Sequence, residues 1–588
     1  MDSIQRLDEV ILSDIKLERY AKGYKVEVLN DSILVKNGNS LTDLLRFNSN
    51  IYFKENGYGM VSSASFRGTN AAQTAVIWNG ININSQLNGQ VDFNTIVSTN
   101  YDALQIRSGG GSVQYGSGAI GGTVHLSNNL DFKKHLDQRL QLGFGSFNTG
   151  QANYKVNYGN EKFSAIAGVA YLGSDNDYRY LNSELRNENG AFNNLDISLN
   201  LGYTLSETDV FKLYHQNFRS EREFSGTLLA PSLSKYETED YRTMLEWAHI
   251  KPKFSSNFKA VHLYEKFKYF ENVELEQFNL GQVNTWLIKH RYKLEISKRV
   301  EFLLITDFSQ SLGKGDSFIN PKRDAFSATA IISHRPTPNL QYALNIRQDA
   351  ISDFDSPLVF SGDFSYQVFK WYQLKLNASK NFRVPTFNDL YWSPGGNLDL
   401  EPETSFQIDL GHDINFKDLD IRLNTFYIET SDLIQWRPNA REGFWNPINI
   451  ANSKHYGLEA ELRLKKNLGK HRLEYRVNYS FTETEDVENE RRLFYVPLHK
   501  ANTSIAYSYK NFSAFYQHLY NGKVNIIGNT LADFDVANIS IAYTLKNKKN
   551  WNYTADFRIN NLYNRYYENV VFRPMPNRNY RLRLILNI

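Results

Sequence analysis

The chain has 588 residues, of which 41% are hydrophobic, 14% aromatic and 22% charged. Its 66 Lys and Arg residues against 63 Asp and Glu leave a formal charge of only +3, which argues against a nucleic-acid-binding protein. Cysteine is absent, which excludes disulfides and Cys-ligated metals, and no apolar run approaches the roughly 18 to 20 residues of a membrane-spanning helix.

Residues 1–130 predict a small α+β unit. The chain starts without the basic and apolar stretches of a secretory leader, which leaves a cytosolic protein or a mature form as alternatives. Ser40, with Asp43 three positions on and leucines at helical spacing, predicts a helix that begins at Ser40. Short strands are expected at residues 75–78 and 103–106, joined by glycine-rich turns.

Residues 116–121 match the GxGxxG pattern of dinucleotide-binding sites. That pattern requires a helix to follow, but residues 123–126 are strand-like, so we interpret the glycines as turn residues. HExxH, GxSxG and Walker A motifs are absent, and the 12 histidines show no metal-ligand spacing. We therefore predict that the chain is not an enzyme and that no cofactor is required.

From residue 131 to the end, apolar and polar residues alternate with period two. Residues 195–205 show the pattern, with Leu, Ile or Tyr at every odd position, and residues 458–465, 473–482 and 580–588 repeat it. A single strand of this kind also fits a soluble antiparallel sheet. The region offers no amphipathic helix to cover so many apolar faces, however, and a closed barrel in lipid needs no cover.

The length of this region sets the size of the barrel. With roughly 450 residues and roughly 20 per strand and loop, about 22 strands result, and a lumen of that width needs a plug. We predict an all-β membrane protein, an antiparallel transmembrane β-barrel of about 22 strands with an N-terminal α+β plug domain in its lumen. The expected segments are 1–15 (N-terminal segment), 16–130 (plug) and 131–588 (barrel).

Motifs along the whole chain carry a family resemblance. They are SFRGTNA (65–71), VIWNGININ (76–84), IRSG (106–109), SVQYGSGAIGG (112–122), NFRVPTFNDLYW (381–392), LEPET (400–404) and NNLYNRYY (560–567). In order and spacing they resemble the plug, mid-barrel and C-terminal signatures of TonB-dependent outer-membrane receptors. The resemblance implies a protein of the Gram-negative outer membrane that imports a scarce nutrient.

The resemblance also implies energy from TonB of the inner membrane, delivered through an N-terminal Ton box. Leu7, Asp8, Glu9, Val10 and Ile11 occupy that place. A short extended segment can add as a strand to a partner's sheet edge, where backbone hydrogen bonds carry tension. The alternative is an ordinary first strand of the plug.

Ligand contacts are expected from two outward plug loops, residues 56–60 and 84–90. The candidate residues are Tyr58, Met60, Asn84, Ser85, Gln86, Leu87, Asn88 and Gln90. Amides, a phenol and apolar groups with almost no charge suit a large ligand, neutral or of mixed polarity and rich in amides, better than a bare ferric anion. Residues 67–71 also resemble the family's cobalamin receptors. We therefore expect the ligand to be cobalamin or a related corrinoid, with a ferric siderophore, haem or peptide as alternatives. For each loop residue taken singly, the alternative to ligand contact is an ordinary residue of a solvated turn.

Asp175 and Asp177 predict a possible calcium site in an outer loop, because clustered carboxylates suit a hard cation. The alternative, here and for the acidic stretch 483–490, is a solvated charged loop. For the whole chain, the rival to an energised transporter is a passive porin. We expect a monomeric barrel in the lipid bilayer, with a small-molecule ligand, no nucleic acid, and a surface lipoprotein as a further possible partner.

Overall fold

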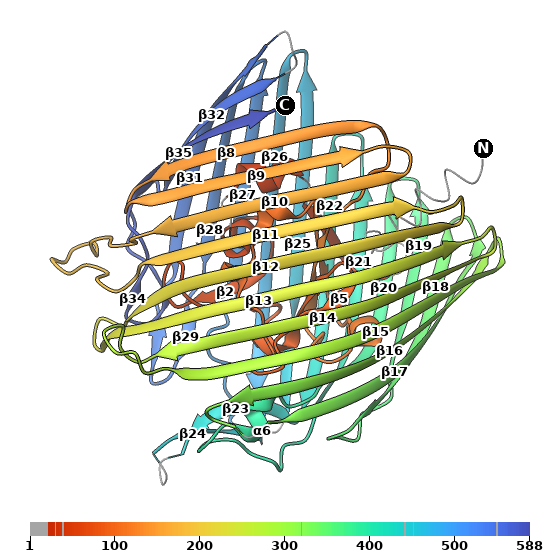
Figure 1. The fold of residues 1–588 in the computed structure, drawn as a ribbon, viewed down its shortest axis with the longest axis horizontal. Helices are drawn as coiled ribbons and strands as arrows, with labels where there is room; N and C mark the ends of the chain where they lie inside the picture. Colours follow the sequence, from red (N-terminus) through yellow and green to blue (C-terminus); the bar gives the residue numbers. More distant parts are fainter. Residues whose placement is uncertain are drawn as a thin grey trace.

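The computed structural model describes residues 22–29, 31–37, 40–318, 320–439, 443–450, 452–547 and 551–588. They form a closed antiparallel barrel of 22 strands around a smaller mixed sheet (Figure 1). The predicted fold, a barrel of about 22 strands with an N-terminal α+β plug in its lumen, is thereby confirmed. No helix among the described residues is long and apolar enough to cross a membrane.

The barrel strands follow sequence order around the wall, and the last pairs with the first. They are β8 (His135–Gly145), β9 (Thr149–Gly159), β10 (Phe163–Ser174), β11 (Phe192–Thr204), β12 (Asp209–Gly226), β13 (Pro231–Ile250), β14 (Phe254–Phe270), β15 (Asn279–Ser297), β16 (Val300–Gly315), β17 (Lys322–Thr337), β18 (Leu340–Ile351), β19 (Val359–Phe369), β20 (Tyr372–Arg383), β21 (Glu403–Asn415), β22 (Leu419–Ser431), β25 (Ser453–Leu468), β26 (His471–Asp486), β27 (His499–Tyr509), β28 (Phe512–Asn521), β31 (Phe534–Lys546), β32 (Asn552–Asn560) and β35 (Asn579–Asn587). Closure leaves no unpaired sheet edge in the wall.

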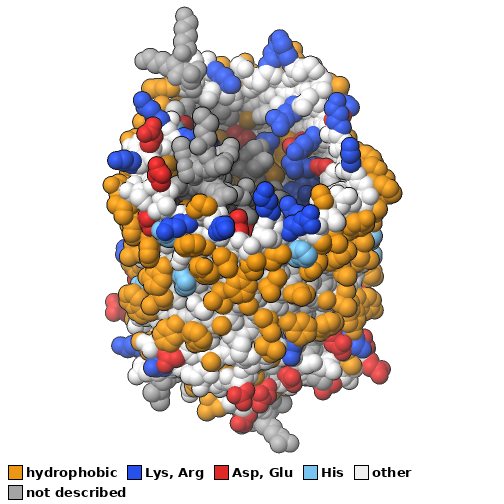
Figure 2. Space-filling view, turned by 90° about the vertical axis from the view of Figure 1, so that its right-hand side faces the viewer, with side chains coloured by type: hydrophobic (Ala, Val, Ile, Leu, Met, Phe, Trp, Pro, Cys, Tyr) orange, Lys and Arg blue, Asp and Glu red, His pale blue; other side chains and the backbone are white. Residues whose placement is uncertain are grey.

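The period-two pattern sorts side chains between the two faces of the wall. In β11, Ile197 is 42% exposed on the outer face, whereas Asp196 is fully buried against the lumen contents. Figure 2 shows the result on one face of the barrel, a broad band of hydrophobic side chains across the wall. In β35, Ile585 is buried on the inner side, which explains the one break in the C-terminal alternation.

The plug is built on a five-stranded sheet in which only β4 and β7 run parallel. Its elements are β1 (Val26–Leu29), α3 (Asp31–Lys36), α4 (Leu41–Asn48), β2 (Tyr52–Glu55), β3 (Ser62–Ser65), η1 (Ala71–Gln73), β4 (Thr74–Trp78), β5 (Ile81–Asn82), η2 (Phe93–Thr95), η3 (Ser98–Asn100), β6 (Ala103–Ser108), α5 (Ser112–Tyr115) and β7 (Gly122–Ser127). As predicted, Ser40 caps a helix, since its Oγ accepts from the Asp43 N–H at 3.1 Å. The glycine-rich turn likewise leads into a strand, β7.

The core of the plug continues onto the barrel wall. Trp78 of β4 is 1% exposed and packs edge-on against Tyr214 of β12, with ring centroids 6.4 Å apart. Met244 and Val261 of the wall belong to the same buried cluster. The plug is therefore packed against the lumen and does not hang loosely in it.

The connections between barrel strands differ at the two ends of the barrel. One end, the turn end, carries short turns, while the other, the loop end, carries long loops with α6 (Phe387–Tyr391), β23 (Leu433–Pro438), β24 (Trp445–Ile450), β29 (Val524–Ile526), β30 (Asn529–Leu531), β33 (Glu568–Val570) and β34 (Arg573–Pro574). The labelled loop elements lie along the left and lower edges of Figure 1.

Candidate functional site

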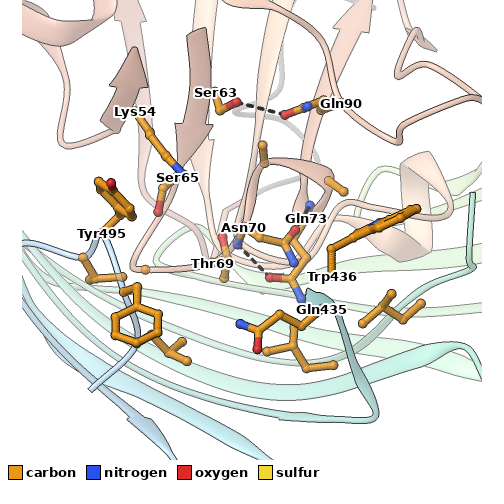
Figure 3. Close-up of a pocket in the computed structure, with 18 of the residues that line it drawn as sticks. Lys54, Ser63, Ser65, Thr69, Asn70, Gln73, Gln90, Gln435, Trp436 and Tyr495 are labelled. Atoms are coloured by element: carbon orange, nitrogen blue, oxygen red, sulfur yellow. Dashed lines mark hydrogen bonds between the residues drawn. The ribbon is translucent and has the colours of Figure 1, made fainter. Parts of the chain in front are cut away.

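A cavity of about 750 Å³ lies at the loop end, between the plug and the barrel loops. The plug contributes β2, β3 and residues 68–73, and the barrel contributes the β23–β24 hairpin and residues 491–496. Figure 3 shows side chains from both parts around one space. A ligand in this cavity would touch the plug and the wall together.

The plug side of the cavity is polar and held in place by its own hydrogen bonds (Figure 3). Asn70 and Gln73 form a reciprocal cap on η1, in which each side chain accepts from the other's backbone N–H, at 3.1 and 3.0 Å. Ser63 Oγ donates to Gln90 Oε1 at 3.1 Å. These fixed amides and hydroxyls can recognise a polar ligand without first becoming ordered.

The barrel side is aromatic and cationic. Trp436 of β23 donates its indole N–H to Asp389 at 2.9 Å, and Trp445 of β24 is 53% exposed. Tyr495 holds a left-handed backbone, with φ of 56°, and its ring lies 4.2 Å from the Lys54 ammonium. A bulky residue in that conformation is a strain that proteins keep mostly at functional sites.

Gly68 marks the floor of the cavity, where the plug meets β25 and β26. Its φ is +77°, and a Cβ there would lie 2.6 Å from Thr484 Cγ2 and 3.2 Å from His455 Nδ1. Only glycine fits both the backbone and the space. The neighbouring Arg67 points to the barrel wall, where it pairs with Asp409 and Glu459.

Below the cavity, a buried ion network between plug and wall includes Lys25, Glu27, Arg67, Asp409 and Glu459, and Arg476 of the wall contacts Glu27 at 2.9 Å. Arg67 contacts Asp409 at 2.6 Å and Glu459 at 3.2 Å, and Lys25 contacts Glu459 at 3.5 Å and Glu27 at 3.0 Å. The network therefore links the floor of the cavity to β1, the first described plug strand.

A buried histidine lies in the same plug sheet. His125 of β7 is 4% exposed, its Nε2 lies 2.7 Å from Thr123 Oγ1, and its ring packs on Tyr115. Burial, together with the nearby positive charge of Arg107, lowers the pKa of His125 to about 3. The plug therefore contains a neutral imidazole that resists protonation.

Two of the predicted ligand residues, Asn88 and Gln90, line the cavity. Asn84 instead braces its own loop, because its amide donates to the carbonyl oxygens of Thr74 and Gly89, both at 2.8 Å. Ser85 accepts from the Leu87 N–H at 3.0 Å in the same loop.

The other four predicted residues also lie outside the cavity lining. The Gln86 N–H donates to Glu265 at 3.0 Å, and Leu87 is buried against Phe387. Met60 is 1% exposed, and Tyr58 packs on Phe192 with ring centroids 5.9 Å apart. Ligand contact by any of the eight residues stays a prediction.

The predicted Ton box, Leu7 to Ile11, lies outside the described residues. At the predicted calcium site, Asp175 accepts from Asn148 at 3.1 Å and Asp177 pairs with Arg186 at 3.3 Å. In the described part of the chain, no group of three or more His, Asp or Glu side chains is placed to hold a metal ion. The calcium site therefore stays a prediction without a ligand set.

Sequence reasoning missed Lys54 on the plug side and the whole barrel side of the cavity. Lys54, Trp436 and Tyr495 come from three segments far apart in the chain, and only the closed barrel brings them together. Their local sequence carries no period or motif. The one signal available was the cluster of aromatic and basic residues at 434–437 and 491–495.

Comparison with known proteins identifies the family of both domains. The family described as TonB dependent receptor-like, beta-barrel, matches residues 138–562, and the TonB-dependent Receptor Plug Domain matches residues 23–123. The vitamin B12 transporter BtuB of Vibrio vulnificus (strain YJ016) is 24% identical over 537 residues, which cover 87% of this chain and 83% of that protein.

Solved structures share the fold. The siderophore receptor PirA of Acinetobacter baumannii matches with a TM-score of 0.82 and 15% identity, over 97% of this chain and 99% of that one. The FrpB iron transporter of Neisseria meningitidis (F3-3 variant) matches with a TM-score of 0.81 and 14% identity, again over 97% and 99%. The barrel match alone covers well over half of the sequence.

Receptors of this family lie in the Gram-negative outer membrane, where the long loops of such barrels face outward and the short turns face the periplasm. They bind a small-molecule substrate and depend on TonB for transport, and they are not enzymes. With its plug, its 22-stranded wall and its outward cavity, this chain belongs to the TonB-dependent receptors, the transporters of the outer membrane.

Proposed function

We propose that this receptor imports cobalamin or a related corrinoid. The observation that carries the proposal is the cavity of about 750 Å³, lined on one side by fixed plug amides and on the other by indole and phenol rings. A corrinoid has a broad apolar ring edged with amide groups, which suits that division. The similarity to vitamin B12 transporters at 24% identity supports the same ligand.

Import also requires that ligand bound at the outer face alters the availability of the Ton box on the periplasmic side. This is a coupling between two sites. The buried ion network offers a physical route for it. Gly68 and Thr69 line the cavity, Arg67 precedes them, and Glu459 joins Arg67 to Lys25 just before β1. A ligand that shifts residues 68–69 would disturb the pairing that holds β1 against the wall.

Titration of the purified receptor with cyanocobalamin tests the proposal. Quenching of tryptophan fluorescence is the readout, because Trp436 and Trp445 line the cavity. We expect submicromolar binding, and a smaller response in the Trp436→Leu variant, in which Trp445 is the remaining tryptophan of the cavity. Absence of submicromolar cobalamin binding, with tight binding of a ferric siderophore, would assign the receptor to the alternative ligand class.

The porin alternative is tested by conductance in planar bilayers. The intact receptor should stay closed, and deletion of residues 1–130 should open it, since the plug is packed against the lumen. A steady open pore in the intact protein would favour a passive channel. A surface lipoprotein partner remains a proposal that co-purification from native membranes decides.

A further inference from the structure

Lys54 of β2 is a plug cation that lines the cavity. Among the described residues no Asp or Glu pairs with it, and its ammonium lies against the Tyr495 ring, 4.2 Å from Nζ to the ring centroid. Two other cations nearby are paired with carboxylates, since Arg46 contacts Glu55 and Arg383 contacts Glu403 at 2.9 Å. A third, Lys500, donates instead to the carbonyl oxygens of Arg46 and Ser49, at 3.3 and 2.7 Å. A partly buried ammonium without a counter-charge is costly, and an anion of a bound ligand would lower that cost.

A second cation makes the surroundings of Lys54 more positive. Arg573 of β34 donates Nη1 to the Asn56 carbonyl at 3.0 Å and has no carboxylate partner among the described residues. Burial, and after it the like charge of Arg573, lowers the pKa of Lys54. A negative charge beside the ammonium would offset both effects, because it favours the charged form of Lys54.

The rest of the cavity lining repeats this excess of positive charge. Arg437 and Arg491 share one carboxylate, Asp486, at 3.9 and 3.6 Å. Arg437 Nη2 is buried without a hydrogen-bond partner. The cavity's own carboxylate, Asp389, is already taken by Arg383 at 3.4 Å and by an indole N–H.

Tyr495 fixes the position of the ammonium. Its backbone N–H donates to the Asn525 carbonyl at 2.9 Å, which holds the loop in the left-handed turn, with φ of 56°. The ring covers one side of Lys54 by a cation–π contact. Across the strand pair, Lys54 lies opposite Ser63 of β3, whose hydroxyl faces the cavity with it (Figure 3).

We infer that the ligand of this cavity carries an anionic group, a phosphate or a carboxylate, on a large apolar body, and that Lys54 receives the anion. The apolar body lies against Trp436 and Trp445. The inference rests on the proposed function only in taking this cavity as the ligand site. It revises the expectation of an almost uncharged site, which considered the plug loops without the barrel loops.

The test compares ligands that differ in the anion. Cyanocobalamin carries a phosphodiester, and dicyanocobinamide has the same corrin ring but lacks the phosphate together with its ribose and dimethylbenzimidazole. The comparison of Lys54 variants with each ligand therefore isolates the part of the difference that depends on Lys54. A ferric triscatecholate is anionic, and a neutral ferric trihydroxamate is not. Each is titrated into the full-length receptor and into Lys54→Met, Lys54→Arg and Lys268→Met, the last a control on the outer wall, where Lys268 pairs with Glu237 at 3.4 Å.

We expect Lys54→Met to weaken cyanocobalamin binding about tenfold or more, because a charge-assisted hydrogen bond is lost, and to leave dicyanocobinamide within about twofold. Lys54→Arg should restore most of the affinity, and Lys268→Met should match the wild type. Barrel integrity is checked for each variant by SDS gel electrophoresis, in which a folded barrel migrates differently in unheated and heated samples.

The outcomes separate this inference from the cobalamin proposal. If cobalamin fails to bind but the triscatecholate binds in a Lys54-dependent way, the cobalamin proposal falls and the anion site stands. If Lys54→Met weakens charged and uncharged ligands equally, or neither, the anion site is wrong. A wild-type receptor that binds only uncharged ligands, or none of the four, overturns it as well.

Discussion

Two sets of ion pairs use the same residue types in opposite surroundings. In the buried ion network the Arg67 side chain is 1% exposed and contacts Asp409 at 2.6 Å. On the outer face of β12, β13 and β14, Arg219 is 59% exposed and contacts Glu239 at 3.1 Å. We call that second set the outer ladder; its members are Arg219, Glu221, Lys235, Glu237, Glu239, Lys266 and Lys268.

The comparison shows that position, and not charge content, decides what an ion pair does here. Removing one partner of a buried pair leaves an uncompensated charge in a poorly solvated place, whereas water replaces an exposed partner at little cost. The network joins plug to wall between the cavity and β1. The ladder joins neighbouring strands that are already joined by backbone hydrogen bonds.

The largest effect on transport is expected from a change that leaves both sets of ion pairs intact. Val10→Pro in the proposed Ton box removes a backbone donor and should abolish uptake of radiolabelled ligand, since strand addition to TonB needs that N–H. Ligand affinity and thermal stability should equal those of the wild type. Unimpaired uptake would remove the Ton-box assignment.

The next largest effect is expected from breaking the network. Glu459→Gln leaves Arg67 and Lys25 with one carboxylate fewer, and breaking a buried pair in this way typically costs about 3–5 kcal/mol. We expect the plug to become protease-sensitive at a lower urea concentration while the barrel stays folded, and uptake to fall. Planar-bilayer conductance measured under the same urea conditions reports plug release directly.

Glu459→Asp is the matched control, because it keeps the charge and shortens the side chain by one methylene. It should recover part of the lost stability. If Glu459→Gln is as stable as the wild type, the network is not what fastens the plug, and the route from cavity to β1 has to be sought elsewhere.

His125 gives a smaller, pH-dependent effect inside the plug. Its pKa is lowered from 6.5 to about 3, so the unfolded plug takes up a proton at higher pH than the folded plug. The stability from the neutral imidazole is therefore present above pH 6.5 and is lost as the pH falls toward 3, by about 2 kcal/mol at pH 5. His125→Gln should flatten this part of the urea-midpoint profile, and an unchanged slope would contradict the assignment.

The sequence predicted the wall far better than the site, for a physical reason. The alternation in residues 195–205 reports a local property, the two faces of one strand, and β11 follows it. Ser40 likewise caps its own helix. The cavity depends on which strands become neighbours after closure. Lys54 and Trp436 line the same cavity only because the 22-stranded barrel closes around the plug.

The smallest effect is expected from the outer ladder. Glu239→Gln removes the central charge between Arg219 at 3.1 Å and Lys266 at 3.7 Å, yet all three side chains remain in water and keep their strand pairing. Exposed pairs of this kind contribute about 0–1 kcal/mol, and salt screens them further. The urea midpoint should therefore match the wild type in 0.5 M salt. A loss of stability as large as that of Glu459→Gln would show that the charges of the outer ladder hold β12, β13 and β14 together. The contrast between the two sets of ion pairs would then no longer hold.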